Sequence, residues 1–299
     1  MRAKFGTAGS PTAFLEEKGA SSRRLPVWLQ ARGLDAFEYQ CGKGVTVGEK
    51  TARQIGEEAR RAHVTLSLHA PYFINPANGD PVQREKNLSY VLAACQAADW
   101  MEARRVVVHT GAVMKRSRHE ALAVAKESFL LMRRACDEAG FAHILLCPET
   151  MGKINQLGDL EEVLELCTLH EGLLPCVDFG HLYARSLGKL EGEEAVVQML
   201  DRMEEVLGLE RATVFHSHFS QIEYTLKGGE ARHLTFDQEE FGPDFAPLGR
   251  EIARRGWGPT VICESAGTQD RDAITMRDSY RHALDSLGCA ASKPRRCQG

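Results

Sequence analysis

The sequence lacks the features that mark membrane, secreted and disulfide-bonded proteins. No apolar run approaches the roughly 20 residues of a membrane span, and the opening MRAKFGTAGSP has no apolar centre like that of a signal peptide. The nine cysteines include no Cys-x-x-Cys pair, and several lie in apolar runs where a small hydrophobic side chain would serve equally well. We therefore expect a soluble, cytoplasmic protein with buried, reduced thiols and no contact with a membrane.

The chain also lacks an excess of basic residues. Its 37 lysines and arginines stand against 41 acidic residues, which gives a formal net charge of −4. This balance argues against a protein that coats nucleic acid through its net charge alone, but it leaves room for a local basic patch.

What the chain does contain is a repeated alternation of short apolar runs and longer stretches with helical period. The predicted strands cover residues 3–7, 35–39, 64–69, 105–109, 143–149, 173–178, 212–218 and 260–264. The predicted helices cover residues 11–32, 47–62, 84–102, 117–139, 159–170, 190–207, 244–255 and 269–287. Eight such units predict an α/β fold, a single (β/α)8 TIM barrel over residues 1–288, followed by a polar flexible tail over residues 289–299.

Six acidic or imidazole side chains close six of the apolar runs. The C-terminal ends of parallel barrel strands open onto one face, so residues far apart in sequence become neighbours there. Three histidines and three carboxylates at that face suit zinc or manganese. The predicted metal-binding residues are His69, His109, Glu149, Asp178, His218 and Glu264.

Two further spacings refine this set and keep alternatives open. Asp178 and His181 form a D-x-x-H directly after a strand, which fits either a pair of metal sites or a helix cap. His216 and His218 alternate along one strand, so both face the same side, and we expect His218 to be the ligand and His216 to support it. Gly111 is expected to let the backbone pass close to a ligand.

Six stretches of the chain carry a family resemblance: HAPYFINPAN, VVVHTGA, LLCPETMGK, PCVDFGHLYA, the segment from His218 to His233, and VICESAG. Together they resemble the endonuclease IV family of apurinic/apyrimidinic endonucleases, within the wider xylose-isomerase-like group of barrels. The resemblance implies two or three zinc ions, with Mn²⁺ as an alternative. It places His69, His109 and Glu149 around one ion. It places Glu149, Asp178, His218 and Glu264 around a second, and His181 and His233 at a third. It assigns the catalytic roles to Glu149, Glu264 and Asp178.

The chain departs from that family at two places. The third site would take a carboxylate two positions before His233, where this chain has Ala231, so we expect a weak site unless Glu230 or Glu223 swings in from a flexible KGGEAR loop. The loop after the second strand is short and offers Lys43 as its nearest cation.

The resemblance makes duplex DNA with abasic sites the expected partner, and no protein partner is inferred. Tyr72 matches a residue with which the family probes the duplex, although it could equally be an aromatic lid on the barrel rim. The expected DNA-binding residues are Tyr72, Lys43 and Arg232, and the wider set of candidate phosphate contacts is Lys115, Arg116, Arg118, Lys153, Lys227 and Arg232.

Three functions remain in competition at this point. The first is a zinc-dependent phosphodiesterase that cleaves DNA 5′ to abasic sites in base excision repair, as the resemblance implies. The second is a sugar isomerase or epimerase with one divalent ion, and the third is a non-catalytic barrel that binds a metal or a sugar phosphate. The pair His181 and His233 favours the first, because a one-metal isomerase has no need of it.

Overall fold

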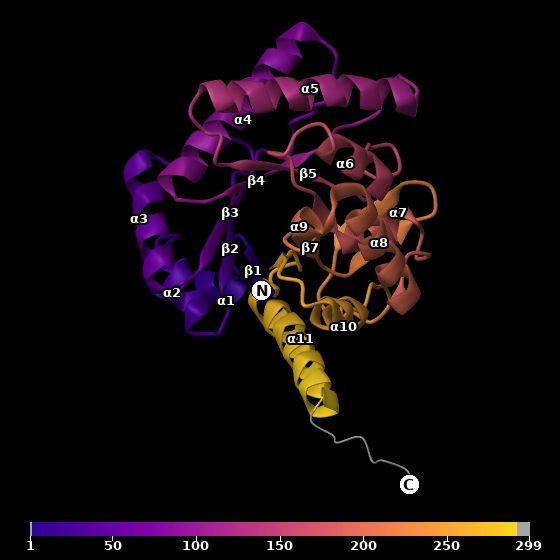
Figure 1. Cartoon of the computed structure of the whole chain (residues 1–299). Coiled ribbons are helices and arrows are strands. Elements are labelled where there is room, and N and C mark those ends of the chain that lie inside the picture. The colour runs from indigo at the N-terminus through magenta and orange to yellow at the C-terminus, as the bar shows by residue number, and fades with distance from the viewer. Residues whose placement is uncertain (1, 292–299) are drawn as a thin grey trace.

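Eight parallel strands close into a barrel with the order β1-β10-β7-β6-β5-β4-β3-β2 (Figure 1). The structure is a computed structural model and describes residues 2–291. The barrel strands are β1 (Lys4–Ala8), β2 (Ala36–Gln40), β3 (Thr65–His69), β4 (Arg105–His109), β5 (Leu145–Glu149), β6 (Cys176–Asp178), β7 (His216–Phe219) and β10 (Thr260–Cys263). The predicted TIM barrel is confirmed, with one strand in each of the eight expected places.

The helices form the outer ring of the barrel, as Figure 1 shows. They are α1 (Thr12–Leu15), α2 (Leu25–Gln30), α3 (Glu49–Arg61), α4 (Pro81–Trp100), α5 (Arg118–Glu138), α6 (Leu160–Cys167), α7 (Phe179–Arg185), α8 (Gly192–Leu207), α9 (Leu209–Ala212), α10 (Ala246–Arg255) and α11 (Gln269–Ala291). Helix α11 runs three residues past the expected start of the tail, and residues 292–299 lie outside the described part of the chain.

Two prolines limit the regular pairing of β5 and β6. Pro148 lies inside β5, and the flanking Leu146 and Thr150 donate their backbone N–H groups to the β6 side. Pro148 cannot donate, so the β5–β6 ladder is interrupted and its regular pairing is Glu149 with Cys176. Pro175 likewise precedes β6, which begins only at Cys176 rather than at residue 173.

Three local predictions were wrong. The helix expected over residues 11–32 is broken into α1 and α2 by the segment 16–24, which contains Gly19, Ser21 and Ser22. The seventh strand begins at His216 instead of residue 212, because α9 occupies its expected start. A hairpin of β8 (Ile222–Thr225) and β9 (Gly229–His233) follows β7 where only a flexible loop was expected.

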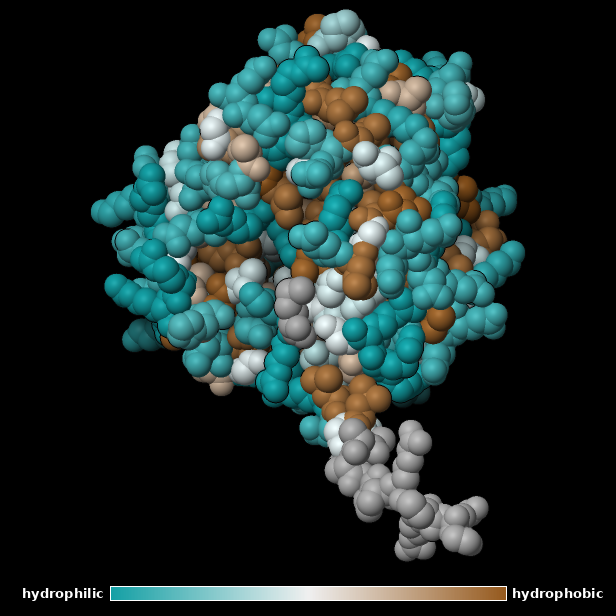
Figure 2. All heavy atoms as spheres, in the orientation of Figure 1, coloured by the Kyte–Doolittle hydropathy of each residue, from teal (hydrophilic) through white to brown (hydrophobic). Residues whose placement is uncertain are grey.

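The main core lies between the barrel wall and its helices, where residues such as Phe5, Phe37 and Leu68 are buried. A second small cluster of apolar side chains, including Val107 and Cys176, lies apart from it. The seven cysteines whose side chains are described are buried and free, as expected. Figure 2 shows one face of the molecular surface, which is mostly hydrophilic with apolar areas between the hydrophilic residues. No helix in residues 2–291 is long and apolar enough to cross a membrane.

Candidate metal centre

The six predicted strand-end side chains meet at the C-terminal mouth of the barrel, and Glu149 lies at their centre. Its Oε2 lies 3.3 Å from Nε2 of His69 and 3.3 Å from Nε2 of His109. Its Oε1 lies 2.9 Å from Nδ1 of His218 and 3.6 Å from Nδ1 of His181. The side chain is 1 % exposed, so a single buried carboxylate faces four imidazoles from four different elements. This is the arrangement expected of a ligand that bridges two ions.

Three carboxylates crowd around His218. Ligand atoms of Glu149, Asp178 and Glu264 come within 4.8 Å of one another and of an imidazole nitrogen of His218. Asp178 caps α7 through Oδ1, which accepts the backbone N–H of His181 at 2.7 Å, so the helix-cap alternative is also real. Its Oδ2 is buried without a hydrogen-bond donor among residues 2–291. Buried like charges and an orphaned oxygen are costly without a cation, so this donor set fits a divalent metal.

Backbone carbonyls fix the orientation of three of the histidines. Nδ1 of His69 lies 2.7 Å from the Ala70 carbonyl, and Nδ1 of His109 lies 2.9 Å from the Tyr72 carbonyl. Nδ1 of His181 lies 2.8 Å from the Thr150 carbonyl. Each contact favours the tautomer that carries its proton on Nδ1, which leaves the Nε2 lone pair free to bind a metal.

Glu38 is the residue that sequence reasoning missed. It lies in β2 with no exposed surface, and its oxygens are 2.8 Å from Nε2 of His216 and 2.8 Å from Nε2 of His218. Ser67 Oγ and Gln40 Nε2 donate to the same carboxylate. His218 therefore turns Nδ1 to the centre, whereas His216 contacts Glu38 and Arg105 from deeper in the barrel.

A signal for Glu38 does exist in the sequence. Its neighbours Phe37 and Tyr39 are apolar and belong to the outer core, so the period-two alternation of β2 turns Glu38 inward. Burial opposes its ionisation, but the charge of His218 and the hydrogen bond with His216 hold the pKa of Glu38 well below its usual value. Glu38 is therefore a buried carboxylate that contacts Nε2 of the candidate metal ligand His218 and can orient its ring.

Replacing Glu38 with Gln is expected to weaken zinc affinity by about 10–100-fold, the usual cost of losing the group that orients a metal-binding histidine. Competition with a chromophoric chelator measures the change. Glu251→Gln is the matched control, because Glu251 is 4 % exposed but pairs with Arg254 and Arg255 away from the centre. Equal affinity in the Glu38 variant and the control would contradict a supporting role for Glu38.

A third cluster of donors lies beside this centre and corrects the expectation about Ala231. His181, Glu230 and His233 bring one ligand atom each within 4.8 Å of one another. Glu230 Oε2 lies 3.5 Å from Nε2 of His181, and Nδ1 of His233 lies 2.8 Å from Ser220 Oγ. Glu223 is ion-paired with Arg232 instead. The expectation of a site short of one carboxylate is therefore wrong.

A β-bulge explains why position 230 serves where position 231 does not. In the hairpin Glu223 pairs with Arg232 and Tyr224 pairs with Glu230, which leaves Ala231 as the extra residue. One extra residue reverses the alternation, so Glu230 points to the same side as His233. The hairpin is also held against the loop after β5, because the backbone N–H of Glu230 donates to the carbonyl of Gly152. The segment that was expected to be a flexible loop is therefore largely part of a paired strand.

Gly152 makes room for this carboxylate. A Cβ at that position would lie 2.6 Å from Cβ of Glu230, 2.8 Å from its Oε2 and 3.0 Å from Cδ2 of His181. Only glycine therefore lets the loop after β5 approach the hairpin so closely. At Gly111 an added Cβ would meet Oδ1 of Asn75 at 2.3 Å and the backbone N of Ala77 at 2.9 Å, so this glycine makes room for the loop after β3, and its expected approach to a ligand stays a prediction.

The charges of the centre set the protonation of its histidines in the metal-free protein. Burial disfavours the imidazolium of His69, but its hydrogen bond with Glu149 and the charge of that carboxylate outweigh this and raise the pKa of His69 to about 9. Burial is likewise outweighed at His181, where Asp178 and Glu230 raise the pKa to about 9. Burial lowers the pKa of His109 to about 4, so that ring is neutral at pH 7.

These pKa values predict that zinc binding at pH 7 releases protons. His69 and His181 carry protons below about pH 9 when no metal is bound, and a ligating imidazole must be neutral. Apparent zinc affinity should therefore rise as pH increases from 7 to 9 and fall as pH decreases. Calorimetric titrations in buffers of different ionisation enthalpy count the protons, and a count near zero at pH 7 would contradict these pKa values.

The mouth of the barrel is a cavity of about 290 Å³ lined by the candidate ligands. Tyr72 stands at its rim with 52 % of its surface exposed, and Lys153 and Gln156 line the side toward the hairpin. Lys43 is exposed on the turn after β2. Tyr72 is thus free to contact a large substrate, while its backbone carbonyl holds His109.

Several of the expected phosphate contacts are committed elsewhere. Arg232 is ion-paired with Glu223, and Arg118 donates to the carboxylate of Glu162 and to the carbonyl of Gln156. Arg116 donates to the carbonyl of Ala77. Arg118 in particular has a structural role, because these contacts join α5 to the loop after β5 and to α6. The remaining candidates, Lys115, Lys153 and Lys227, form no ion pair within the described residues.

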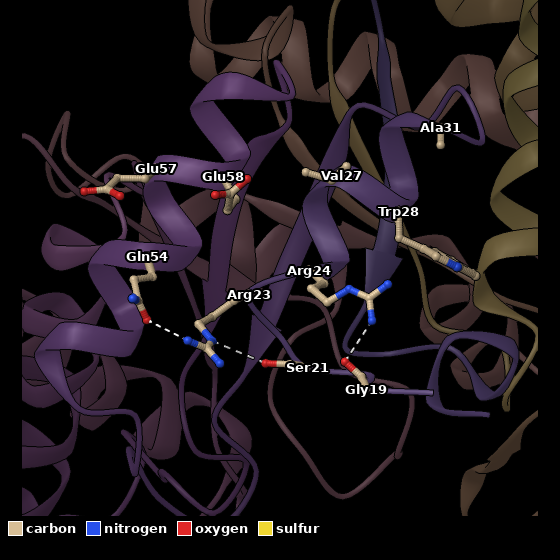
Figure 3. Close-up of a pocket in the computed structure, with 10 residues that line it drawn as sticks. All are labelled: Gly19, Ser21, Arg23, Arg24, Val27, Trp28, Ala31, Gln54, Glu57 and Glu58. Carbon is tan, nitrogen blue, oxygen red and sulfur yellow. Dashed lines mark hydrogen bonds between the residues drawn. The ribbon is translucent and has the colours of Figure 1, made fainter. Parts of the chain in front are cut away.

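A larger cavity, of about 590 Å³, lies outside the barrel between α2 and α3 (Figure 3). Its arginines are held by neighbours, since Arg23 donates to Gln54 and Ser21 and Arg24 donates to the carbonyl of Gly19. Among the described residues, its lining contains no histidine or cysteine. Size alone therefore does not identify the reactive site, and the donor chemistry favours the barrel mouth.

Comparison with known proteins gives relatives over most of the chain. An uncharacterized protein of Methanocaldococcus jannaschii is 32% identical over 278 residues, which are 92% of this chain and 96% of that protein. A probable endonuclease 4 of Aster yellows witches'-broom phytoplasma is 27% identical over 247 residues, 80% of this chain and 78% of that protein.

Solved structures share the fold at lower identity. A D-tagatose 3-epimerase-like protein has a TM-score of 0.70 at 18% identity and covers 97% of this chain and 100% of its own. Endonuclease IV from Thermus thermophilus has a TM-score of 0.67 at 19% identity and covers 95% of this chain and 99% of its own. The family model described as xylose isomerase-like TIM barrel matches residues 27–287, and the chain therefore belongs to the xylose isomerase-like TIM barrel family.

Proposed function

We propose that the protein is a zinc-dependent phosphodiesterase of the endonuclease IV type, which cleaves duplex DNA 5′ to abasic sites. The observation that carries the proposal is the third donor cluster of His181, Glu230 and His233 beside the two that share Glu149. Three adjacent clusters can hold three ions, and a site of several ions suits the transfer of a highly charged phosphoryl group. The probable endonuclease 4 relatives support the same assignment.

The chain's own residues would hold the ions and the substrate. His69 and His109, which both face Oε2 of Glu149, would hold one ion with that carboxylate. Glu149 would share a second ion with Asp178, His218 and Glu264. His181, Glu230 and His233 would hold the third. When bound, such ions neutralise phosphate oxygens and lower the pKa of coordinated water toward neutrality.

Glu264 differs from the other carboxylates of the centre. Burial raises its pKa, and the nearby charges of Glu149 and Asp178 act in the same direction against the imidazole of His218. It would thus be the carboxyl group of the centre best able to hold a proton at its side of the cavity. Tyr72 and Lys153 would contact the DNA at the rim, because both line the mouth.

A sugar epimerase remains the second candidate, and one observation favours it. The mouth has a volume of about 290 Å³, close to the lower end of small-ligand pockets at roughly 300 Å³. The loop between β2 and α3 is short and offers only Lys43 to a duplex. An epimerase with one divalent ion, however, would not need the cluster of His181, Glu230 and His233.

One experiment separates the two candidates. Zinc-loaded protein is expected to incise a duplex oligonucleotide at a single tetrahydrofuran abasic analogue, leaving a 3′-hydroxyl, and to leave the undamaged duplex intact. The same preparation is tested for epimerisation of D-fructose and D-tagatose, with metal content determined on every sample. Epimerisation without incision would overturn the proposal.

A further inference from the structure

A second polar cavity, of about 390 Å³, opens at the opposite end of the barrel, where the strands begin. Lys4, Thr65, Arg105 and Thr260 stand at the first residues of four barrel strands, and Arg2 and Arg104 complete the rim. No acidic side chain of the described residues lines the cavity. Four cationic groups thus converge at one end of the barrel axis, at the far end from the candidate metal centre.

None of these four cations forms an ion pair with a carboxylate within residues 2–291. The guanidinium of Arg105 donates to the carbonyl of Val214 at 2.8 Å and lies 3.4 Å from Nδ1 of His216, both neutral partners. The ammonium of Lys4 donates to the hydroxyl of Thr65. The charge of Lys4 acts on Asp35 without forming an ion pair, and Oδ1 of Asp35 accepts the backbone N–H of Phe5.

Arg2, Lys4 and Arg104 are exposed at the rim, Arg105 is half-buried, and like charges brought to one cavity repel one another. Burial lowers the pKa of Arg105, because a charged guanidinium is less favourable away from water. The charge of Glu38 acts against this effect, and the ring of His216 lies between Arg105 and Glu38. Within the described part of the chain, the carboxylates that act on these cations, Glu38 on Arg105 and Asp35 on Lys4, therefore lie outside the lining of the cavity.

We propose that this basal cavity, defined by Arg2, Lys4, Arg104 and Arg105, binds a phosphate group. A phosphate presents several charged oxygens to several donors, and the planar fork of arginine matches that geometry. The volume exceeds what a bridging water would need and lies within the range of small-ligand pockets, roughly 300–1000 Å³, so the phosphate can belong to a small organic ester. The site is independent of the proposed phosphodiesterase activity.

The test is a calorimetric titration of zinc-loaded, full-length protein with inorganic phosphate, ribose 5-phosphate and ribose at constant ionic strength. The double variant Lys4→Gln/Arg104→Gln removes two exposed cations of the rim. The matched control Lys86→Gln/Arg134→Gln removes two exposed cations of α4 and α5 and changes the net charge equally. Phosphate that binds at the metal centre should be unaffected by either pair, because both pairs lie away from it, so it serves as an internal reference.

We expect one additional equivalent of phosphate binding, weakened about tenfold or more in the rim variant and unchanged in the control, as the loss of charged hydrogen bonds requires. Crystals soaked in tungstate should show anomalous density between Lys4 and Arg104. Ribose 5-phosphate binding more tightly than inorganic phosphate identifies an ester as the ligand, and equal affinity identifies the free anion. Arg2→Gln repeats the test if the double variant does not fold.

Two results would overturn the proposal. One is equal affinity for phosphate in all three proteins, with tungstate found only at the metal centre. The other is binding of single-stranded DNA that the rim variant abolishes, without any phosphate or ribose 5-phosphate binding, which would make the cavity part of a nucleic-acid surface.

Discussion

Replacing Glu149 with Gln is expected to abolish phosphodiesterase activity and to lower the metal content while the barrel stays folded. The two oxygens of Glu149 face His69, His109, His181 and His218, so this one carboxylate contacts four candidate ligands. Burial opposes its charge, but the charge of His218 and the hydrogen bonds from His218 and His69 hold the pKa of Glu149 well below its usual value. It is therefore a carboxylate at neutral pH.

Gln has the same shape but no charge, so it cannot bridge two cations. We expect incision to fall by about 10³-fold or more, the scale on which a group that stabilises transition-state charge acts. Metal analysis and circular dichroism are measured on the same sample. Full metal occupancy in this variant would contradict the bridging role.

Glu162→Gln is the control for unfolding. Glu162 is also a buried glutamate, 7% exposed, but it belongs to the capping box of α6 and pairs with Arg118. Its replacement should lower the melting temperature and leave the metal content unchanged. Metal loss in both variants would mean that the Glu149 result reflects stability instead of ligation.

The sequence was sufficient to place the strand-end residues because two simple regularities act together. A polar residue that closes an apolar run marks the end of a buried strand, and parallel strands bring those ends to one face. His69, His109 and Glu149 follow from that alone. The position of His218 nearer the C-terminal end of its strand predicts it as the ligand in place of His216, and its contact with Glu149 supports that prediction.

The sequence was not sufficient where the local chain departs from regular alternation. The bulge at Ala231 changes which side chains of β9 share a face, and no composition signal marks it. Glu38 could have been found from its apolar neighbours, but a glutamate inside a strand is more often on the solvent side of a sheet. In a closed barrel the other side is the interior, where Glu38 meets His216 and His218.

Replacing Glu230 with Gln is expected to remove one equivalent of zinc and to leave the other two in place. The cluster of His181, Glu230 and His233 contains a single carboxylate, whereas the adjoining cluster also has Glu149, Asp178 and Glu264. Without that charge two imidazoles alone would hold the ion. Glu223→Gln is the matched control on the same hairpin, because Glu223 pairs with Arg232 outside the cavity.

Incision at an abasic analogue should fall by about 100-fold in the Glu230 variant, as expected when one charge-stabilising group of a phosphoryl-transfer site is lost, and should be unchanged in the control. In the parent protein all three equivalents should leave over a narrow range of chelator concentration, because Glu230 already completes the third cluster. Early loss of one equivalent from the parent, prevented by Ala231→Asp, would show that Glu230 does not ligate and that position 231 decides the strength of this site.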